Sequence, residues 1–260
     1  ATSTWAPRSR HRWIPGTDAD LSRLAEDNQQ SPMVRATAVL LLRNYPCEST
    51  IPTLRKMLQD ANSLIRSEAV IALDFLPPND RVPFLLPVLQ DPVRLVRTLA
   101  ARSLAPIPSG ILSKEAGQQR DAAIREYEES QMLNADYPAA HMNLGNLYLE
   151  RGEYDRAAAS YKKAIEIEPA FIPGYINLAD VYRAQNQDEK GKSILLHTLD
   201  IAPESASAHH ALGLLMIRTG GQKEALHHLR KASTREPENA RYSYVYGVAL
   251  NSLEMSGQAI

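Results

Sequence analysis

Apolar residues recur at steps of three and four along most of the 260-residue chain, a spacing that predicts amphipathic helices. The clearest examples are Ile51, Leu54 and Leu58, followed by Ile65, Ala69 and Leu73. Such helical segments come in pairs, and the pairs repeat along the chain. The pattern therefore predicts an all-α protein, built as a right-handed α-α superhelix (a solenoid) from stacked helix pairs.

The first array has a period of 31 residues. Arginines and leucines share this step, as do apolar positions in the helices that precede them. The members of the two best-matched positions are Arg35, Arg66 and Arg97, and Leu42, Leu73 and Leu104. A fixed period of this size is typical of stacked two-helix units.

This array, over residues 20–110, resembles HEAT repeats. Asp60 and Arg66 lie six residues apart, and so do Asp91 and Arg97. The resemblance implies that these residues form a ladder between adjacent repeats. The alternative is two ordinary surface pairs, each contributing little to stability. In the first unit Gln29 stands in the aspartate position, which predicts an imperfect cap.

A second array, over residues 138–260, has a period of 34 residues. Prolines repeat at this step, as do small residues at the eighth position of each unit. They are Pro169, Pro203 and Pro237, and Gly145, Ala179, Gly213 and Gly247. The array resembles tetratricopeptide repeats, with three full units at 138–171, 172–205 and 206–239 and a partial fourth from residue 240. Small residues let two helices approach closely, and proline ends the second helix.

Three segments lie outside the full repeats. Residues 1–19 are expected to be an extended linker; its stretch 5–13, with both tryptophans, could instead be a binding segment. Residues 111–137 are expected to form a linking helix, the second half of a degenerate tetratricopeptide repeat that joins the arrays. The chain stops inside the fourth repeat, which suggests a truncated piece or a docking tail, and allows self-association through the uncapped end.

The first helices of tetratricopeptide repeats line a concave groove, and this resemblance supplies the candidate peptide-binding residues. They are Met142, Asn143, Asn146, Glu150, Ile176, Asn177, Asp180, Arg183, His210, Leu214, Arg218 and Tyr244. Asn143 and Asn177 share one repeat position, and an amide can both donate to and accept from a peptide bond. The alternative is that the asparagines only solvate the surface. The cations with which chaperone-binding members clamp a terminal carboxylate are missing here.

The charge balance and the missing sequence motifs limit the functions that the sequence allows. The chain carries 29 basic and 30 acidic residues, a balance that argues against nucleic acid as a partner, and no apolar run is long enough to span a membrane. Cys47 is the single cysteine, so no disulfide and no CxxCH haem attachment exists within these residues. Catalytic motifs are absent, and the histidines lack the partners of a metal site. We expect a non-enzyme without catalytic residues, metal or other cofactor.

The C-terminal part of bacterial multihaem c-type cytochromes resembles this chain in sequence. The resemblance is carried by segments 134–145, 171–183, 209–215 and 241–246, in this order after HEAT-like repeats. That resemblance implies an exported protein whose haem c lies in an upstream domain, and a periplasmic or extracellular location. Without it, a cytoplasmic location is expected.

The function predicted from the sequence is a non-catalytic scaffold for protein–protein interaction. It would bind an extended peptide or a partner helix in the groove. The alternative is the scaffold part of a multihaem cytochrome, which holds redox partners for electron transfer.

Overall fold

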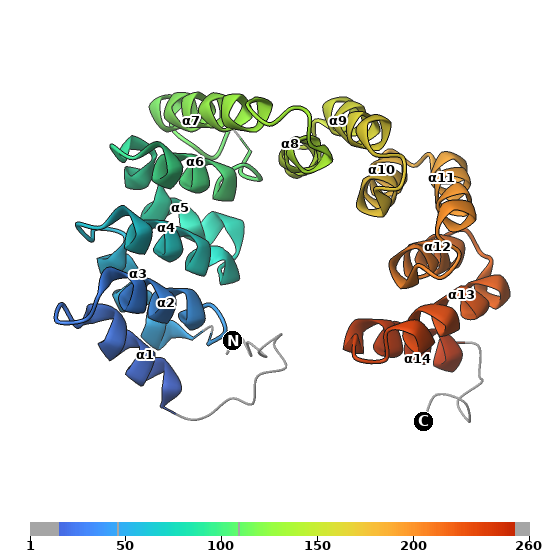
Figure 1. Cartoon of the computed structure of the whole chain (residues 1–260), viewed down its shortest axis with the longest axis horizontal. Helices are drawn as coiled ribbons and strands as arrows, with labels where there is room; N and C mark the ends of the chain where they lie inside the picture. The colour runs from blue at the N-terminus through green and yellow to red at the C-terminus, as the bar shows by residue number, and fades with distance from the viewer. Residues whose placement is uncertain (1–15, 46, 109, 253–260) are drawn as a thin grey trace. The chain divides into compact units, whose positions relative to one another are not determined.

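The computed structural model describes residues 16–45, 47–108 and 110–252, and every element within them is helical. The chain divides into two compact units between residues 130 and 131. In each unit the helices follow one another in chain order as a stack of antiparallel pairs (Figure 1). The all-α repeat fold predicted from the sequence is confirmed. Residues 1–15 of the predicted linker, with segment 5–13, and the last eight residues lie outside the described residues. The predicted linker boundary at residue 19 is wrong, because a helix already begins at Thr17.

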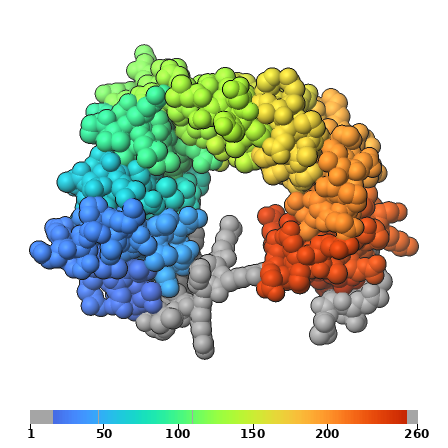
Figure 2. All heavy atoms as spheres, in the orientation of Figure 1, coloured from blue at the N-terminus to red at the C-terminus, as the bar shows by residue number. Residues whose placement is uncertain are grey.

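Among its described residues, the first unit contains three helix pairs and one longer helix. The pairs are α1 (Thr17–Glu26) with α2 (Pro32–Leu42), α3 (Ile51–Met57) with α4 (Ser63–Ala72), and α5 (Pro78–Leu85) with α6 (Arg94–Ser103). Three short 3₁₀ helices accompany them: η1 (Glu48–Thr50), η2 (Leu73–Phe75) and η3 (Pro87–Gln90). Helix α7 (Lys114–Met132) follows α6 and belongs to this unit up to residue 130. Space-filling atoms show these helices stacked in chain order (Figure 2).

Local sequence explains where the helices of this unit begin and break. Ser31 caps α2 by accepting the Val34 amide, and Asn62 caps α4 by accepting the Leu64 amide. Pro87 lacks an amide hydrogen to continue α5, so the first helix of the third pair ends early and resumes as η3.

The buried core of the first unit is formed by apolar residues that follow the 31-residue period. Three leucines that share one repeat position are fully buried: Leu42, Leu73 and Leu104. Ile65 and Val96, which also lie 31 residues apart, are fully buried as well. Each repeat therefore contributes the same apolar positions to one continuous interior, as expected for a solenoid.

The ladder predicted from the HEAT resemblance is present and links adjacent repeats. Arg35 pairs with Asp60, and the Arg66 guanidinium donates two bonds to the carboxylate of Asp91, at 2.7 and 2.9 Å. Arg66 and Asp91 are 11% and 7% exposed, so these are not ordinary surface pairs. The two-pronged geometry fixes the register of one repeat on the next.

Helix α7 supplies the third rung. The Arg97 guanidinium donates to the carboxylate of Glu126, with the closest contact at 2.6 Å, and Arg94 donates to Glu129 at 3.2 Å. Glu126 thus takes the role that Asp60 and Asp91 have in the earlier repeats. The helix expected to link the two arrays closes the end of the ladder.

The second unit contains seven helices among the described residues. They are α8 (Pro138–Glu150), α9 (Tyr154–Ile167), α10 (Ile172–Ala184), α11 (Asp188–Ile201), α12 (Ala206–Arg218), α13 (Gln222–Arg235) and α14 (Ala240–Ser252). Gly152, Asn186 and Gly220, 34 residues apart, have positive φ of 73°, 57° and 88° at the turn inside each repeat. Glycine and asparagine tolerate this left-handed turn, which reverses the chain between the paired helices.

Small residues bring the paired helices together as predicted. A Cβ atom on Gly145 would lie 2.6 Å from Cδ1 of Tyr161, and one on Gly213 would lie 2.7 Å from Cγ of Leu229. Tyr161 and Leu229 are fully buried in the gaps that the glycines leave. The glycine positions are therefore set by steric fit between helices.

Candidate functional site

The candidate peptide-binding residues lie on the first helix of each repeat in the second unit: α8, α10, α12 and α14. Their exposure differs. Exposed are Glu150, Arg183, Leu214, Arg218 and Tyr244; half-buried are Met142, Asn143, Asn146, Ile176, Asn177 and Asp180; buried is His210. Most of the predicted positions can therefore reach solvent from one helix set.

Two of the asparagines bond to each other across neighbouring repeats. The Asn146 carbonyl oxygen accepts from Nδ2 of Asn177 at 3.1 Å and from the Tyr161 hydroxyl at 2.7 Å. Burial raises the pKa of Tyr161, and the carboxylates of Asp180 and Glu150 raise it further, so this hydroxyl keeps its proton. The amide nitrogen of Asn146 and the carbonyl oxygen of Asn177 make no hydrogen bond within the described part of the chain.

This arrangement leaves one donor group and one acceptor on adjacent repeats. A peptide bond needs one acceptor and one donor, so the pair matches an extended backbone whatever its side chains. Because Tyr161 and the Asn146–Asn177 bond hold both amides in place, little side-chain freedom would be lost on binding.

Asn143 and Asn177 share a repeat position but have different partners. Nδ2 of Asn143 donates to Oε1 of Gln131 at 3.0 Å, at the C-terminal end of α7. The structure therefore joins Asn177 to Asn146, a relation that the 34-residue spacing does not reveal.

Three of the charged candidate residues, Asp180, Arg183 and Arg218, form salt bridges. Asp180 and Arg183 form a salt bridge of 3.0 Å, and Arg218 lies 3.2 Å from the carboxylate of Asp188. Arg218 also donates to the carbonyl of Arg183 at 3.2 Å and to the side chain of Asn186 at 2.8 Å. Arg218 therefore ties α12 to α10, and Arg183 is paired within α10, so both arginines already have acceptors.

His210 differs from the other candidates because its ring is covered. It is 7% exposed, and its centroid lies 4.5 Å from that of the Tyr242 ring. Burial lowers the pKa of His210, and the nearby Arg241 lowers it further. Tyr242 stands where the earlier repeats have Ala140, Gly174 and Ala208. That large residue at a small-residue position was the available signal that α14 covers His210.

A second histidine, His209, has a structural role in the third tetratricopeptide repeat. His209 takes the place that Tyr175 has in the preceding repeat, and each ring bonds the proline carbonyl six residues earlier, at 2.9 and 3.0 Å. Nδ1 of His209 lies 2.9 Å from Nδ1 of His228, so one of these nitrogens donates to the other. Burial lowers the pKa of His228 to about 4, and the neighbouring His209 contributes.

The described residues show neither a metal-binding cluster nor a membrane-spanning helix. No group of three or more His, Cys, Asp or Glu side chains there is arranged to hold a metal ion. Within the same residues, no helix combines the length and the apolar character needed to cross a bilayer.

Comparison with known families identifies the repeats. A profile for HEAT repeats matches residues 21–105, and a profile for the tetratricopeptide repeat matches residues 138–171. The two predicted repeat types are confirmed. The fold and these matches define an α-helical repeat protein that contains HEAT and tetratricopeptide repeats.

Curated proteins similar to this chain include subunits of assemblies. It is 29% identical over 119 residues to BBSome complex member BBS4 of Bos taurus, covering 45% of this chain and 22% of the relative. It is 25% identical over 126 residues to anaphase-promoting complex subunit CDC16 of Saccharomyces cerevisiae, covering 46% and 15%. The chain thus spans about a fifth of the length of these relatives.

A third relative is named for catalysis. Protein O-mannosyl-transferase TMTC3 of Homo sapiens is 23% identical over 155 residues, which cover 54% of this chain and 17% of the relative. That this chain has no catalytic activity therefore stays a prediction. The resemblance to multihaem cytochromes is not supported by these comparisons.

Two solved structures similar to this one have TM-scores just below 0.5. A thermophilic TPR protein of Thermus thermophilus, TTC0263, has a TM-score of 0.47 at 17% identity, covering 90% of this chain and 98% of that one. MamA has a TM-score of 0.45 at 20% identity, covering 56% and 85%.

Proposed function

We propose that this chain is an interaction scaffold that holds an extended peptide segment of a partner protein against the first helices of its tetratricopeptide repeats. The observation that carries the proposal is the Asn146–Asn177 pair. It offers an amide donor and a carbonyl acceptor, without a partner of their own, on two adjacent repeats.

The surroundings of the pair favour a backbone-reading site. Met142 and Ile176 are half-buried on the same two helices as the amides, α8 and α10, and can contact apolar side chains of the peptide. Arg183 and Arg218 are committed to salt bridges, so recognition would not depend on a terminal carboxylate. The relatives named as subunits of protein complexes support a scaffold role.

The test begins with a peptide selected by display against the whole chain. Its affinity is then measured by calorimetry for the native chain and for the double variant Asn146→Ala/Asn177→Ala. We expect the variant to bind about tenfold more weakly, because two hydrogen bonds to the peptide backbone are lost. Circular dichroism should show unchanged helicity.

A matched control separates the site from general effects. Gln222→Ala removes an exposed amide from α13, a second helix of its repeat. It should leave the affinity unchanged. Equal affinities for the native chain, the double variant and the control would contradict the asparagine site.

A further inference from the structure

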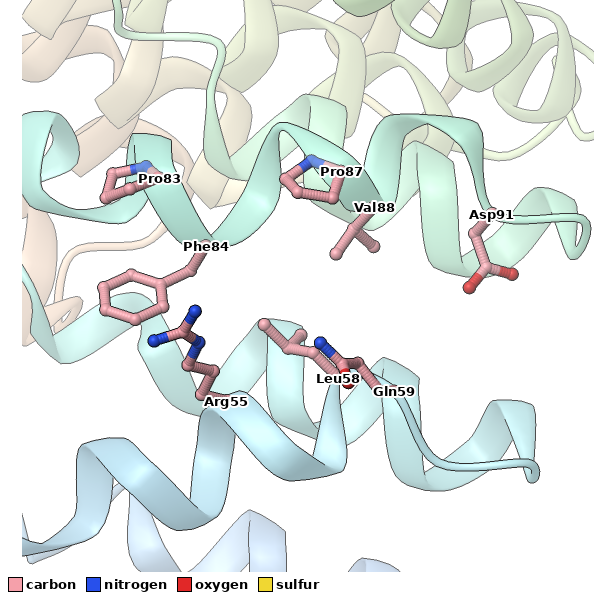
Figure 3. Close-up of a pocket in the computed structure, with 8 residues that line it drawn as sticks. All are labelled: Arg55, Leu58, Gln59, Pro83, Phe84, Pro87, Val88 and Asp91. Atoms are coloured by element: carbon pink, nitrogen blue, oxygen red, sulfur yellow. The ribbon is translucent and has the colours of Figure 1, made fainter.

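A cleft of about 390 Å³ lies in the first unit, between α3 on one side and α5 with η3 on the other. Figure 3 shows the two sets of side chains facing each other across it. The lining residues are Arg55, Leu58, Gln59, Pro83, Phe84, Pro87, Val88 and Asp91. Five of these eight are apolar, a composition common in ligand-binding sites.

The cleft exists because one repeat lacks a bridge that its neighbour has. Between α1 and α3, the carboxylate of Glu26 accepts from Thr53 at 2.8 Å and from Lys56 at 2.6 Å. One period later the positions of Thr53 and Lys56 are occupied by Phe84 and Pro87, neither of which can donate a side-chain hydrogen bond. Polar contacts therefore bridge α1 and α3, whereas these side-chain contacts are missing between α3 and the α5–η3 segment, where the cleft lies.

The two charged residues that line the cleft, Asp91 and Arg55, differ in their hydrogen-bond partners. Asp91 is engaged by the Arg66 guanidinium at 2.7 Å and by the Val93 amide at 2.8 Å. Burial alone would raise the pKa of Asp91, but these bonds outweigh it and the pKa is lowered, so the group stays anionic and paired. The exposed Arg55 has no hydrogen bond or salt bridge within the described residues.

Arg55 lies next to apolar side chains that line the cleft. Its guanidinium points toward the ring of Phe84 at one end of the cleft, while Asp91 lies at the other end (Figure 3). A planar guanidinium offers a fork of donors that fits a carboxylate, and the neighbouring ring and prolines can bury an adjacent apolar side chain. The end of the cleft near Arg55 is thus complementary to a carboxylate with an apolar neighbour.

We propose that this cleft binds a polypeptide segment of a partner protein in which an acidic side chain stands next to an aromatic or aliphatic one. The carboxylate pairs with Arg55, and the apolar side chain lies against Phe84, Pro87 and Leu58. A volume of about 390 Å³ accommodates two such side chains, and a cleft that runs along two helices leaves room for the peptide backbone. The lining residues of this cleft belong to the first unit and include neither asparagine of the pair in the second unit.

The test uses three synthetic decapeptides titrated into the whole isotope-labelled chain and followed by NMR. Their central residues are Phe-Glu-Leu, Phe-Gln-Leu and Ala-Glu-Ala. We expect the first to cause saturable shifts at amides of the lining residues, and the other two to bind at least tenfold more weakly. The proposal is overturned if millimolar Phe-Glu-Leu peptide leaves those amides unshifted, or if all three bind alike.

Two variants assign the interaction to the proposed side chains. Arg55→Gln, at an exposed position, should keep the fold and weaken the Phe-Glu-Leu peptide about tenfold, while the Phe-Gln-Leu peptide loses nothing further. Arg125→Gln removes a second exposed arginine of the same unit that has no ion pair among the described residues, and should change nothing. Equal losses in both variants would show only a nonspecific charge effect and would overturn the role of Arg55.

Discussion

At the scale of single residues, glycine at the helix contacts of the second unit is a steric requirement. At Gly213 a methyl group would meet Leu229 at 2.7 Å and the Ala225 carbonyl at 3.3 Å. We therefore expect Gly213→Ala to lower the free energy of unfolding by about 1–3 kcal/mol, as overpacking does. Urea denaturation followed by circular dichroism measures it.

Gly117 in α7 provides the opposite case, because nothing lies within 4 Å of the Cβ that alanine would add. Gly117→Ala should raise stability by about 0.4–1 kcal/mol, since alanine restricts the unfolded chain and favours the helix. If both substitutions shifted stability in the same direction, steric fit would not be the reason for glycine at 213.

The His209–His228 pair predicts acid sensitivity. The pKa of His228 is about 4 in the folded chain, against about 6.5 for an ordinary histidine, so the unfolded chain binds the additional proton more readily. Stability should therefore fall as the pH drops from about 6.5 through about 4. His209, His227 and Lys231 all oppose the extra charge.

Because the His228 ring is only half-buried, solvent screening limits its share to about 1 kcal/mol. His228→Asn retains a side-chain donor for His209 but has no titratable ring. Thermal midpoints measured between pH 4 and 7 should therefore depend less steeply on pH in the variant than in the native chain. Parallel curves would rule out His228 as the titrating group.

At the scale of elements, the ladder of the first unit should show energetic coupling between repeats. Arg97 and Glu126 are 24% and 32% exposed, and their bidentate contact joins α6 to α7. A double-mutant cycle with Arg97→Ala and Glu126→Ala should give a coupling energy of about 1 kcal/mol. The exposed Lys163–Glu166 pair within α9 should give about 0.3 kcal/mol in the same experiment. Equal coupling energies would mean that α7 does not secure the ladder.

Periodicity predicted the elements well, since each repeat obeys the same packing rule. The turn inside each tetratricopeptide repeat, the buried leucines and the first two rungs of the ladder all keep a constant spacing. The third rung could not be found in this way. Glu126 lies one period after Leu95 rather than after Asp91, because α7 does not continue the HEAT pattern.

The candidate site was predictable in its helices but not in its partners. Repeat spacing placed the asparagines on first helices, yet the Asn177–Asn146 bond depends on how two repeats meet. His210 was placed on the groove because its own repeat position allows it, but Tyr242 from the next repeat covers it. The cleft beside Arg55 depends on Phe84 and Pro87, which differ from the residues at the same positions one repeat earlier. Repeat spacing relies on what the repeats share, so it does not predict a feature that arises from a difference between them.

At the scale of the whole molecule, two compact units imply that stability need not be shared along the entire chain. In repeat proteins each helix pair is stabilised mainly by its neighbours, so the effect of a local defect decays within a few repeats. Gly213→Ala should therefore raise hydrogen-exchange rates in α10–α13, while α2 and α4 of the first unit exchange as in the native chain. Mass spectrometry of peptides from the exchanged protein resolves these regions.

The reciprocal substitution makes this prediction decisive. Asp91→Ala leaves the Arg66 guanidinium, 11% exposed, without its carboxylate and should lower the stability of the first unit by about 3 kcal/mol. Exchange should then rise in α2, α4 and α6, with α10 and α12 unchanged. If either substitution raised exchange equally in both units, the chain would unfold as one cooperative body, and binding at the proposed cleft beside Arg55 would be linked to binding at the proposed asparagine pair through the stability of the whole chain. If the effects stay local, the two sites act as independent modules of one scaffold.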